Sequence, residues 1–315
     1  MTLVTLPQII AARETLSGHL HRTPTVTATY LGQQLDLKLY FKLELLQKTG
    51  SFKPRGVLNR MHHLSAEEKA RGVITLSAGN AAQAVAWAAR QAGVSATVVM
   101  PAGAVQSKVE ATRGYGGAVI QTAESLLDTC LAIQRERNLT LVHPFDDLYL
   151  IAGHGTAGLE LLEDVPQVDA VIVGVGGGGL ISGVAAAVKA HNPAIQVIGV
   201  EPEGASAMTQ SLAKGEPVSL SSVNTIADGL AAPFAGVHTL AHVQAYVDEM
   251  VLVPDTAIIE AMGLILERCK VLAEPAAAST LAALWSGAVK PTPGSTVACI
   301  LSGGNVDRAA LKRLL

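Results

Sequence analysis

Short apolar runs rich in β-branched residues alternate along the chain with longer segments of helical periodicity. The short runs predict strands at Leu37–Leu43, Val73–Leu76, Ala96–Met100, Ala118–Gln121, Thr140–His143, Ala170–Val175, Gln196–Val200 and Val297–Leu301. The longer segments predict helices at Ala81–Ala92, Ser107–Tyr115, Ala123–Asn138, Gly155–Glu163, Leu180–His191, Thr256–Lys270 and Pro275–Ser286. Because strands and helices alternate as in βαβ units, the sequence predicts an α/β fold with parallel sheets.

The predicted strands divide the chain into two parts. Residues 68–147 hold four short β units, and residues 1–67 and 148–315 supply the remaining strands. We therefore expect a small domain, 68–147, inserted into a large one, 1–67 and 148–315. Ligands of open α/β sheets bind beyond the carboxyl ends of the strands, so the cleft between these domains is the expected site.

Composition narrows the class of protein. The 315 residues are 49% hydrophobic and carry a net charge of −3, which gives a sizeable core and no electrostatic basis for binding nucleic acid or an anionic membrane. The three cysteines form no CxxC pair, so neither a disulfide framework nor a zinc cluster is expected, and a reducing cytoplasm fits best. The N-terminal segment lacks the pattern of a secretory signal, and four glycines interrupt the uncharged run 170–188, so no membrane span is expected.

A lysine lies in the turn that follows the first predicted strand, in the segment KTGSFKPRG (48–56). Lys53 stands between Phe52 and Pro54, where the pattern indicates a helix start. Apolar neighbours desolvate an amine, which lowers its pKa and permits Schiff-base chemistry. The alternative is an exposed loop lysine, because most lysines are solvated.

Two further turns each join a predicted strand to a predicted helix. The turn SAGNAAQ (77–83) offers Ser77, Asn80 and the free N–H groups of a helix start, which together favour a carboxylate. An ordinary capping turn is the alternative there. The turn VGGGGL (175–180) allows close backbone approach and leaves amide donors free, so a phosphate is its natural ligand.

The glycine-rich turn also matches a dinucleotide-binding pattern. Gly174, Gly176 and Gly179 satisfy GxGxxG, and Glu201 ends the next strand, where an acidic residue would bind a ribose. A nicotinamide-dependent oxidoreductase is therefore the alternative function. It does not account for Lys53, and GxGxxG alone is weak evidence.

A last turn, LSGGN (301–305), follows the final predicted strand, where Ser302 offers a neutral hydroxyl to a heterocyclic nitrogen. Taken in order, the four turns resemble the fold-type II pyridoxal-phosphate enzymes, and within them the serine/threonine dehydratase and serine racemase family. The segments HRTP, HPFDD, AGHGTAGLEL, GVEP, TIADG and AEP extend the resemblance over nearly the whole chain. It implies a fold like that of the tryptophan synthase β subunit, pyridoxal 5′-phosphate as cofactor and a homodimer.

The resemblance also implies a role for each turn. Lys53 would hold the cofactor as an internal aldimine and remove the substrate α-proton, with Phe52 packed near the ring. Asn80 would hydrogen-bond to the ring hydroxyl, and Ser302 would face the pyridine nitrogen. The residues expected at the phosphate are Gly176, Gly177, Gly178, Gly179 and Leu180. Those expected at the amino-acid substrate are Ser77, Ala78, Asn80, Ala81 and Gln83.

Three positions depart from the family pattern. Ala78 stands where the racemases have a second serine, and because racemisation needs a proton donor on each face, this favours elimination. Ala81 replaces a common histidine, which predicts room for a bulkier substrate such as phenylserine. Of a divalent-cation site, Glu201 and Ala205 match, but Ala207 replaces the aspartate, so no metal is expected.

The sequence therefore predicts a cytoplasmic, pyridoxal-phosphate dependent ammonia-lyase that converts an L-β-hydroxy amino acid of the threonine or serine type to a 2-oxo acid and ammonia. A neutral serine at the pyridine nitrogen makes the ring a weaker electron sink than a carboxylate would, which favours elimination. A racemase with the same cofactor is the nearer alternative, and the oxidoreductase is the more distant one.

Overall fold

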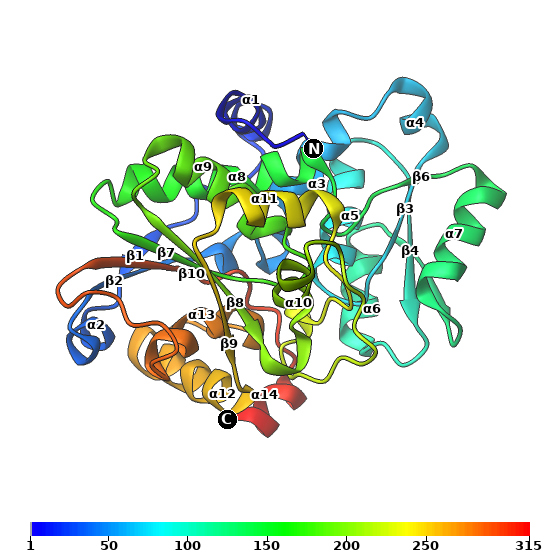
Figure 1. Ribbon diagram of the computed structural model, residues 1–315. Coiled ribbons are helices and arrows are strands. Elements are labelled where there is room, and N and C mark those ends of the chain that lie inside the picture. The colour runs from blue at the N-terminus through cyan, green and yellow to red at the C-terminus, as the bar shows by residue number, and fades with distance from the viewer. Residues whose placement is uncertain (1) are drawn as a thin grey trace.

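The computed structural model describes residues 2–315, and their strands form two sheets that lie side by side (Figure 1). The strands are β1 (Thr25–Thr27), β2 (Lys38–Lys42), β3 (Val73–Leu76), β4 (Ala96–Pro101), β5 (Ala118–Thr122), β6 (Thr140–Leu141), β7 (Ala170–Gly174), β8 (Gln196–Pro202), β9 (Glu249–Val253) and β10 (Thr296–Ile300). The α-helices are α1 (Leu6–Leu16), α2 (Thr29–Leu35), α3 (Lys53–His62), α4 (Ala66–Arg71), α5 (Asn80–Gln91), α6 (Gln106–Gly114), α7 (Leu126–Arg137), α8 (Leu148–Asp164), α9 (Gly179–His191), α10 (Ala207–Lys214), α11 (Val237–Tyr246), α12 (Asp255–Leu264), α13 (Pro275–Trp285) and α14 (Arg308–Leu314). The predicted α/β class is confirmed.

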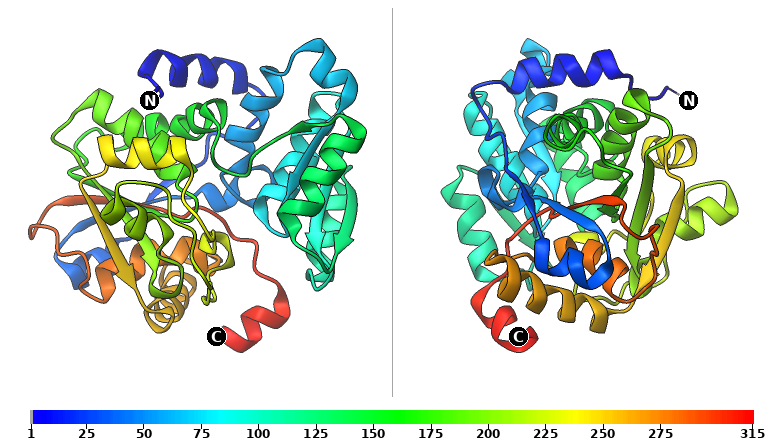
Figure 2. Two further views of the ribbon diagram at one scale, coloured as in Figure 1. Left: turned by 45° about the vertical axis from the view of Figure 1, so that its right-hand side comes forward. Right: turned by 90° about the vertical axis from the view of Figure 1, so that its left-hand side faces the viewer.

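The larger sheet contains six of the strands described for residues 2–315, in the order β1-β2-β10-β7-β8-β9. Adjacent strands of this sheet run parallel, except that β1 pairs antiparallel with β2. Helices α2, α12 and α13 pack on one face, and α9 and α11 pack on the other (Figure 2). Every residue of β7 and β10 is buried, as expected for central strands covered on both faces.

The smaller sheet is parallel throughout and has the order β5-β4-β3-β6. Its strands all lie between β2 and β7 in the chain, in agreement with the four β units predicted for residues 68–147. Helices α5 and α6 cover one face and α7 covers the other. The division into domains at residues 67/68 and 147/148 stays a prediction, and α4 spans the first of these boundaries.

Helix α8 is longer than predicted. The sequence pattern gave Gly155–Glu163, whereas the helix begins at Leu148 because the Asp147 side chain accepts hydrogen bonds from its first backbone amides. The early glycines of α8 are points of close helix contact, since a Cβ on Gly153 would lie 2.3 Å from the backbone oxygen of Arg55 in α3. Glycine therefore serves packing here rather than a turn.

Other elements differ from the prediction in smaller ways. The helix predicted at Thr256–Lys270 is α12 followed by a π turn at Ile265–Cys269, and Lys270 ends it with a left-handed φ of 62°. The strand predicted at Thr140–His143 is shorter, since β6 contains only two residues. Strands β1 and β9 and helices α1, α2, α4, α10, α11 and α14 were not predicted. Among the helices of residues 2–315, none combines the length and apolar character needed to cross a bilayer.

Candidate active site

Strands of both sheets point their carboxyl ends at one cavity of about 820 Å³. The turns that follow β3, β7 and β10 line it, which is where open parallel sheets are expected to bind ligands. Of the residues predicted for the site, those that line the cavity are Phe52, Lys53, Ser77, Ala78, Asn80, Ala81, Gly176, Gly177, Gly178, Gly179, Leu180 and Ser302. Gln83 does not line it; this side chain is buried within α5.

Lys53 is the first residue of α3, and Pro54 follows it at a position where a helix tolerates proline. The Lys53 Nζ donates a hydrogen bond to the backbone oxygen of Pro144 at 2.8 Å and lies 5.1 Å from the centre of the Phe52 ring. Burial lowers the pKa of this amine to about 8, and the negative charge of Glu274 opposes part of the shift. At pH 7 roughly a tenth of an amine with such a pKa is unprotonated, far more than for a solvated lysine, and this is the form that a nucleophile or general base requires.

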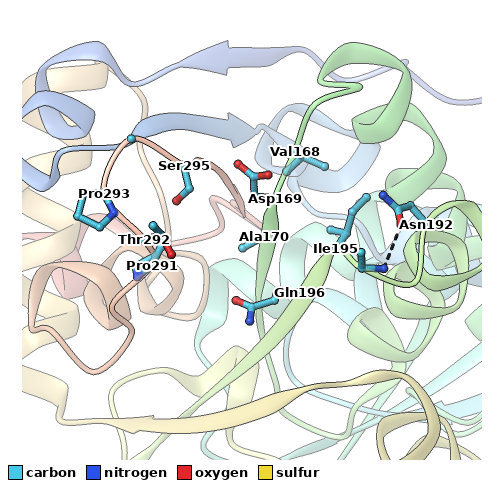
Figure 3. Close-up of a pocket in the computed structure, with 12 residues that line it drawn as sticks. Val168, Asp169, Ala170, Asn192, Ile195, Gln196, Pro291, Thr292, Pro293 and Ser295 are labelled. Carbon is cyan, nitrogen blue, oxygen red and sulfur yellow. Dashed lines mark hydrogen bonds between the residues drawn. The ribbon is translucent and has the colours of Figure 1, made fainter.

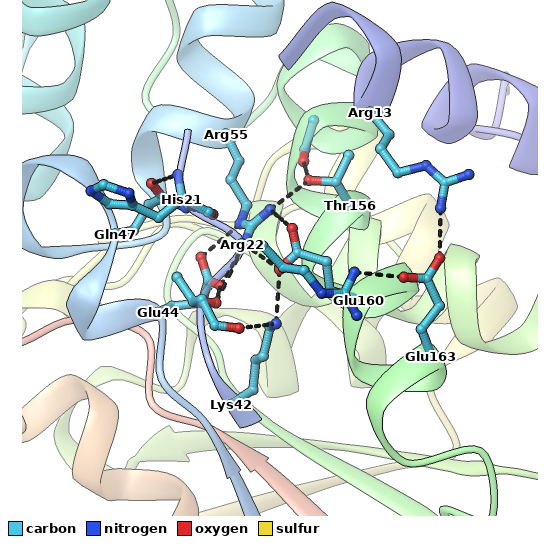
Figure 4. A network of polar contacts seen from close by, with 12 residues as sticks. Arg13, His21, Arg22, Lys42, Glu44, Gln47, Arg55, Thr156, Glu160 and Glu163 are labelled. Carbon is cyan, nitrogen blue, oxygen red and sulfur yellow. Dashed lines mark hydrogen bonds and ion pairs between the residues drawn. The ribbon is translucent and has the colours of Figure 1, made fainter. Parts of the chain in front are cut away.

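A buried network of charges fixes the start of α3 (Figure 4). The Arg55 guanidinium donates to both oxygens of Glu44 at 2.7 and 2.8 Å, and to both oxygens of Glu160 at 2.8 Å. Lys42 donates a further bond of 2.8 Å to Glu160. Two cations thus face two carboxylates, which compensates the cost of burying them. Because Arg55 lies two positions after Lys53, the network anchors the lysine turn to β2 and α8.

The glycine turn presents a row of free backbone donors. None of the amides of Gly176–Leu180 donates a hydrogen bond to another of the described residues. Gly178 has a φ of +90°, and α9 begins directly after it. A Cβ on Gly177 would lie only 2.3 Å from the Phe145 ring, so this position requires glycine. The free amides and the helix N-terminus fit a phosphate group.

The turn after β3 forms a second anion-friendly wall. Asn80 is the first residue of α5, and the amides of Asn80, Ala81 and Ala82 donate to no other residue in the range 2–315. The Ser77 Oγ accepts the Gly79 amide at 3.0 Å, which shapes the turn. These amides and the positive end of α5 fit a substrate carboxylate.

The turn after β10 joins the lysine turn and the Asn80 turn. The Ser302 backbone oxygen accepts the Phe52 amide at 3.0 Å, and Ser302 is one of the residues that line the cavity. Glu274 accepts the Asn80 Nδ2 at 2.7 Å and the Asn305 amide at 3.0 Å. Burial raises the pKa of the Glu274 carboxyl to about 7. Residues from both sheets are therefore connected around one space.

Sequence motifs alone did not single out several residues of the cavity. Phe145 stands against the glycine turn and contacts Phe234, with ring centres 5.4 Å apart. Lys108 and Asp228 form an ion pair of 2.5 Å, one residue from each side of the cavity. Glu274 belongs to the AEP motif, where a glutamate directly before an apolar helix indicates only a helix cap. Their roles depend on contacts between distant segments, which no local pattern encodes.

Glu201 does not face the cavity. Its Oε1 accepts the Met208 amide at 2.8 Å, and its Oε2 accepts the amide and hydroxyl of Thr209 at 2.9 and 2.6 Å, so the carboxylate caps α10. Both carboxylate oxygens are thus engaged in capping, so Glu201 is not placed to bind a ribose. Ala205 and Ala207 beside it have no side-chain oxygen, so these residues do not form a donor set that fits a divalent cation. Residues 2–315 contain no group of three or more histidine, cysteine or acidic side chains placed to hold a metal ion.

A second hollow, of about 560 Å³, lies at the opposite ends of β7, β8 and β10 (Figure 3). Two of its polar side chains are engaged locally: Asp169 accepts the Thr296 amide at 2.8 Å, and Asn192 accepts the Ala194 amide at 3.0 Å. Parallel strands seldom bind ligands at their amino ends, so the larger cavity is the candidate active site.

Comparison with known proteins agrees with this geometry. The profile of the family described as "Pyridoxal-phosphate dependent enzyme" matches residues 16–303. The chain is 43% identical to an L-threonine ammonia-lyase of Thermotoga maritima over 99% of its own length and 78% of that protein. It is 42% identical to a catabolic L-threonine dehydratase of Staphylococcus aureus, over 97% and 90% of the two chains. The structure of maize serine racemase superposes with a TM-score of 0.94 at 42% identity, over 99% and 97% of the two chains. The chain therefore belongs to the pyridoxal-phosphate dependent enzyme family.

Proposed function

We propose that the chain is a pyridoxal-phosphate dependent lyase that removes the β-hydroxyl group of an L-β-hydroxy amino acid and releases a 2-oxo acid and ammonia. One observation carries the proposal. A single cavity contains an amine of lowered pKa at Lys53, a row of free amides at Gly176–Leu180 and a neutral hydroxyl at Ser302. These groups match the aldehyde, the phosphate and the ring nitrogen of the cofactor.

Each wall of the cavity has its own task in this proposal. When bound, the cofactor supplies a ring that withdraws electrons from the α-carbon of an amino acid. The amides of Gly176–Leu180 bind its phosphate, Lys53 Nζ holds it covalently, and Asn80 donates to its ring oxygen. Ser302 Oγ faces its ring nitrogen. A hydroxyl does not keep the ring nitrogen protonated as a carboxylate would, so the ring withdraws electrons less strongly. Elimination is therefore favoured over prolonged stabilisation of negative charge at the α-carbon.

Lys53 is also the proposed base. Its lowered pKa allows Nζ to take the α-proton of the substrate near neutral pH. Ser77 and the amides at the start of α5 orient the substrate carboxylate. Ala78 lies in the same turn and offers no proton to the opposite face of the α-carbon.

A racemase is the second candidate, because the chain is 42% identical to maize serine racemase. The two candidates predict different products from the same substrate. Holoenzyme incubated with L-threonine or L-serine is expected to release a 2-oxo acid and ammonia, with the remaining amino acid still of L configuration. Accumulation of the D-amino acid without 2-oxo acid would favour the racemase and overturn the lyase.

The size of the cavity bears on the substrate. Ala81 is 5% exposed and lines the cavity with Ala78, so each of these two positions presents only a methyl group to the cavity. We infer that the site accepts a β-substituent larger than the methyl of threonine, such as the phenyl ring of phenylserine. The comparison of kcat/KM for phenylserine and threonine tests this inference. A clear preference for threonine would contradict it.

The remaining proposals concern the whole protein. We propose a cytoplasmic homodimer in which residues 68–147 form a small domain inserted into a large domain of residues 1–67 and 148–315. The dimer is expected by resemblance to the dehydratase and racemase family. Light scattering coupled to size-exclusion chromatography measures the mass directly, and a monomeric mass at micromolar concentration would contradict the dimer.

A further inference from the structure

Glu274 closes a ring of hydrogen bonds at the wall of the cavity. Its Oε1 accepts Asn80 Nδ2 at 2.7 Å, and its Oε2 accepts the Asn305 backbone amide at 3.0 Å. The Asn305 side chain completes the ring by donating from Nδ2 to Asn80 Oδ1 at 2.7 Å. Asn80 begins α5 beside the smaller sheet, whereas Glu274 precedes α13 and Asn305 follows β10 beside the larger one. The ring therefore joins the two sides of the cavity.

The ring fixes which way the Asn80 amide points. A primary amide has one oxygen and two N–H donors. In Asn80 the oxygen is used by Asn305 and one N–H is used by Glu274, so the second N–H is the donor that remains for the cavity. A flipped amide would place its oxygen against the Glu274 carboxylate and its NH₂ against the Asn305 NH₂. Both contacts would be repulsive, so the ring makes Asn80 a hydrogen-bond donor toward any bound ligand.

The surroundings of Glu274 are built around a carboxylate. The residue is 6% exposed, and a Cβ on Gly303 would lie 2.5 Å from Oε1. The charged groups that face it are Lys53 of α3, Lys108 of α6 and Asp228 in the loop before α11. Burial raises the pKa of Glu274, and its hydrogen bonds from Asn80 and Asn305 oppose the shift. An isolated buried carboxylate is costly, and here these two donors, together with the positive charge of Lys108, favour the ionised form.

We propose that Glu274 is a positioning residue that holds the Asn80 amide as a donor toward the ring oxygen of the bound cofactor. The inference rests on the cofactor role proposed for Asn80 and adds the group that controls its orientation. Glu274 acts through Asn80 and does not itself touch the cofactor. Removing the carboxylate should therefore lower the affinity for the cofactor only while Asn80 is present.

The test is a double-mutant cycle read by cofactor binding rather than turnover. Apoprotein prepared from the full chain is titrated with pyridoxal 5′-phosphate for wild type, Glu274→Gln, Asn80→Ala and the double variant. In Glu274→Gln, the glutamine NH₂ would face either Asn80 Nδ2 or the Asn305 backbone amide, both of which are donors. One of the two hydrogen bonds to position 274 is therefore lost. We expect Glu274→Gln to weaken cofactor binding roughly tenfold and to shift the visible absorption band of the bound cofactor. In the Asn80→Ala background the same change should alter affinity less than about twofold.

Two further variants make the result specific. Glu267→Gln removes an exposed glutamate of the same half of the chain and should leave affinity unchanged. Asn305→Ala breaks the ring at another point and should weaken binding in the same direction, which covers the case that Glu274→Gln does not fold. If Glu274→Gln lowered cofactor affinity equally with and without Asn80, or did not lower it at all, the inference would be overturned while the proposed function would stand. A wild type that binds no cofactor would overturn the proposed function together with it.

Discussion

At position 81 the cavity wall consists of one methyl group, and this residue gives the proposed substrate preference its sharpest test. Replacing Ala81 by histidine places an imidazole in space that a phenyl substituent would otherwise use. We expect kcat/KM for phenylserine to fall roughly tenfold or more, and kcat/KM for threonine to change far less. Steady-state kinetics with both substrates measure the ratio. Equal losses for the two substrates would contradict a steric role for position 81.

The buried side chain of His154 should make the free energy of unfolding sensitive to acid. Its side chain is fully buried, neither ring nitrogen has a hydrogen-bond partner within residues 2–315, and its ring packs edge-on against Phe52 with centres 4.8 Å apart. Burial, reinforced by the charge of Lys53, lowers the pKa of His154 from 6.5 to about 3. Between these values the unfolded chain binds a proton that the folded chain does not bind, so the free energy of unfolding falls as the pH drops below 6.5.

The slope should approach about 1.4 kcal/mol per pH unit. His154→Gln removes the titrating group, so urea unfolding of this variant should lose less stability than wild type between about pH 7 and about pH 5. The same loss in both proteins would show that His154 does not titrate as described.

At the scale of elements, the glycine turn before α9 is the segment whose geometry leaves least freedom. A methyl group on Gly177 would collide with the Phe145 ring, so Gly177→Ala must displace that ring or the turn. We expect the affinity for pyridoxal 5′-phosphate to fall at least roughly tenfold, because the amide donors move away from the phosphate. Gly114→Ala is the matched control, since a Cβ there meets nothing within 4 Å. Similar affinities for both variants would contradict the assigned phosphate site.

Elements were predicted well where a strand ends in a turn and a helix follows. The junctions at Ser77–Asn80 and Gly176–Gly179 have this form, and both line the cavity as expected from parallel strands. Helix α8 was predicted too short because glycine normally marks a turn, whereas Gly153 here allows α3 to approach closely. The reason lies in the partner helix, which the local sequence does not contain.

For the whole molecule, the buried charges around Arg55 connect segments that are far apart in the chain. Arg55→Met leaves Glu44 and Glu160 buried with only Lys42 to balance them. We expect a loss of about 3–5 kcal/mol in the free energy of unfolding, measured by chemical denaturation. Arg13→Met removes an ion pair with Glu163 whose side chains are both 46% exposed and should cost less than about 1 kcal/mol. Equal costs would contradict a central role for the network.

The sequence also predicted twelve of the 37 residues that line the cavity, yet not how these residues contact one another. Lys53 and Ser302 were identified from their own turns, and the resemblance to a known family supplied their roles. The ring of Asn80, Glu274 and Asn305 joins positions up to 225 residues apart, so only the folded structure reveals it. Gln83 lies in the same motif as Asn80 but is buried and does not line the cavity, so its contact with the substrate stays a prediction.

The most direct measurement locates the bond between cofactor and protein. Holoenzyme is reduced with borohydride, digested and mapped by mass spectrometry, with Lys53→Ala as control. We predict that the visible absorption of the wild type disappears on reduction, that the peptide containing Lys53 carries the cofactor mass, and that the variant carries none. A cofactor mass on a different lysine, or a wild type that never acquires the chromophore, would contradict the account.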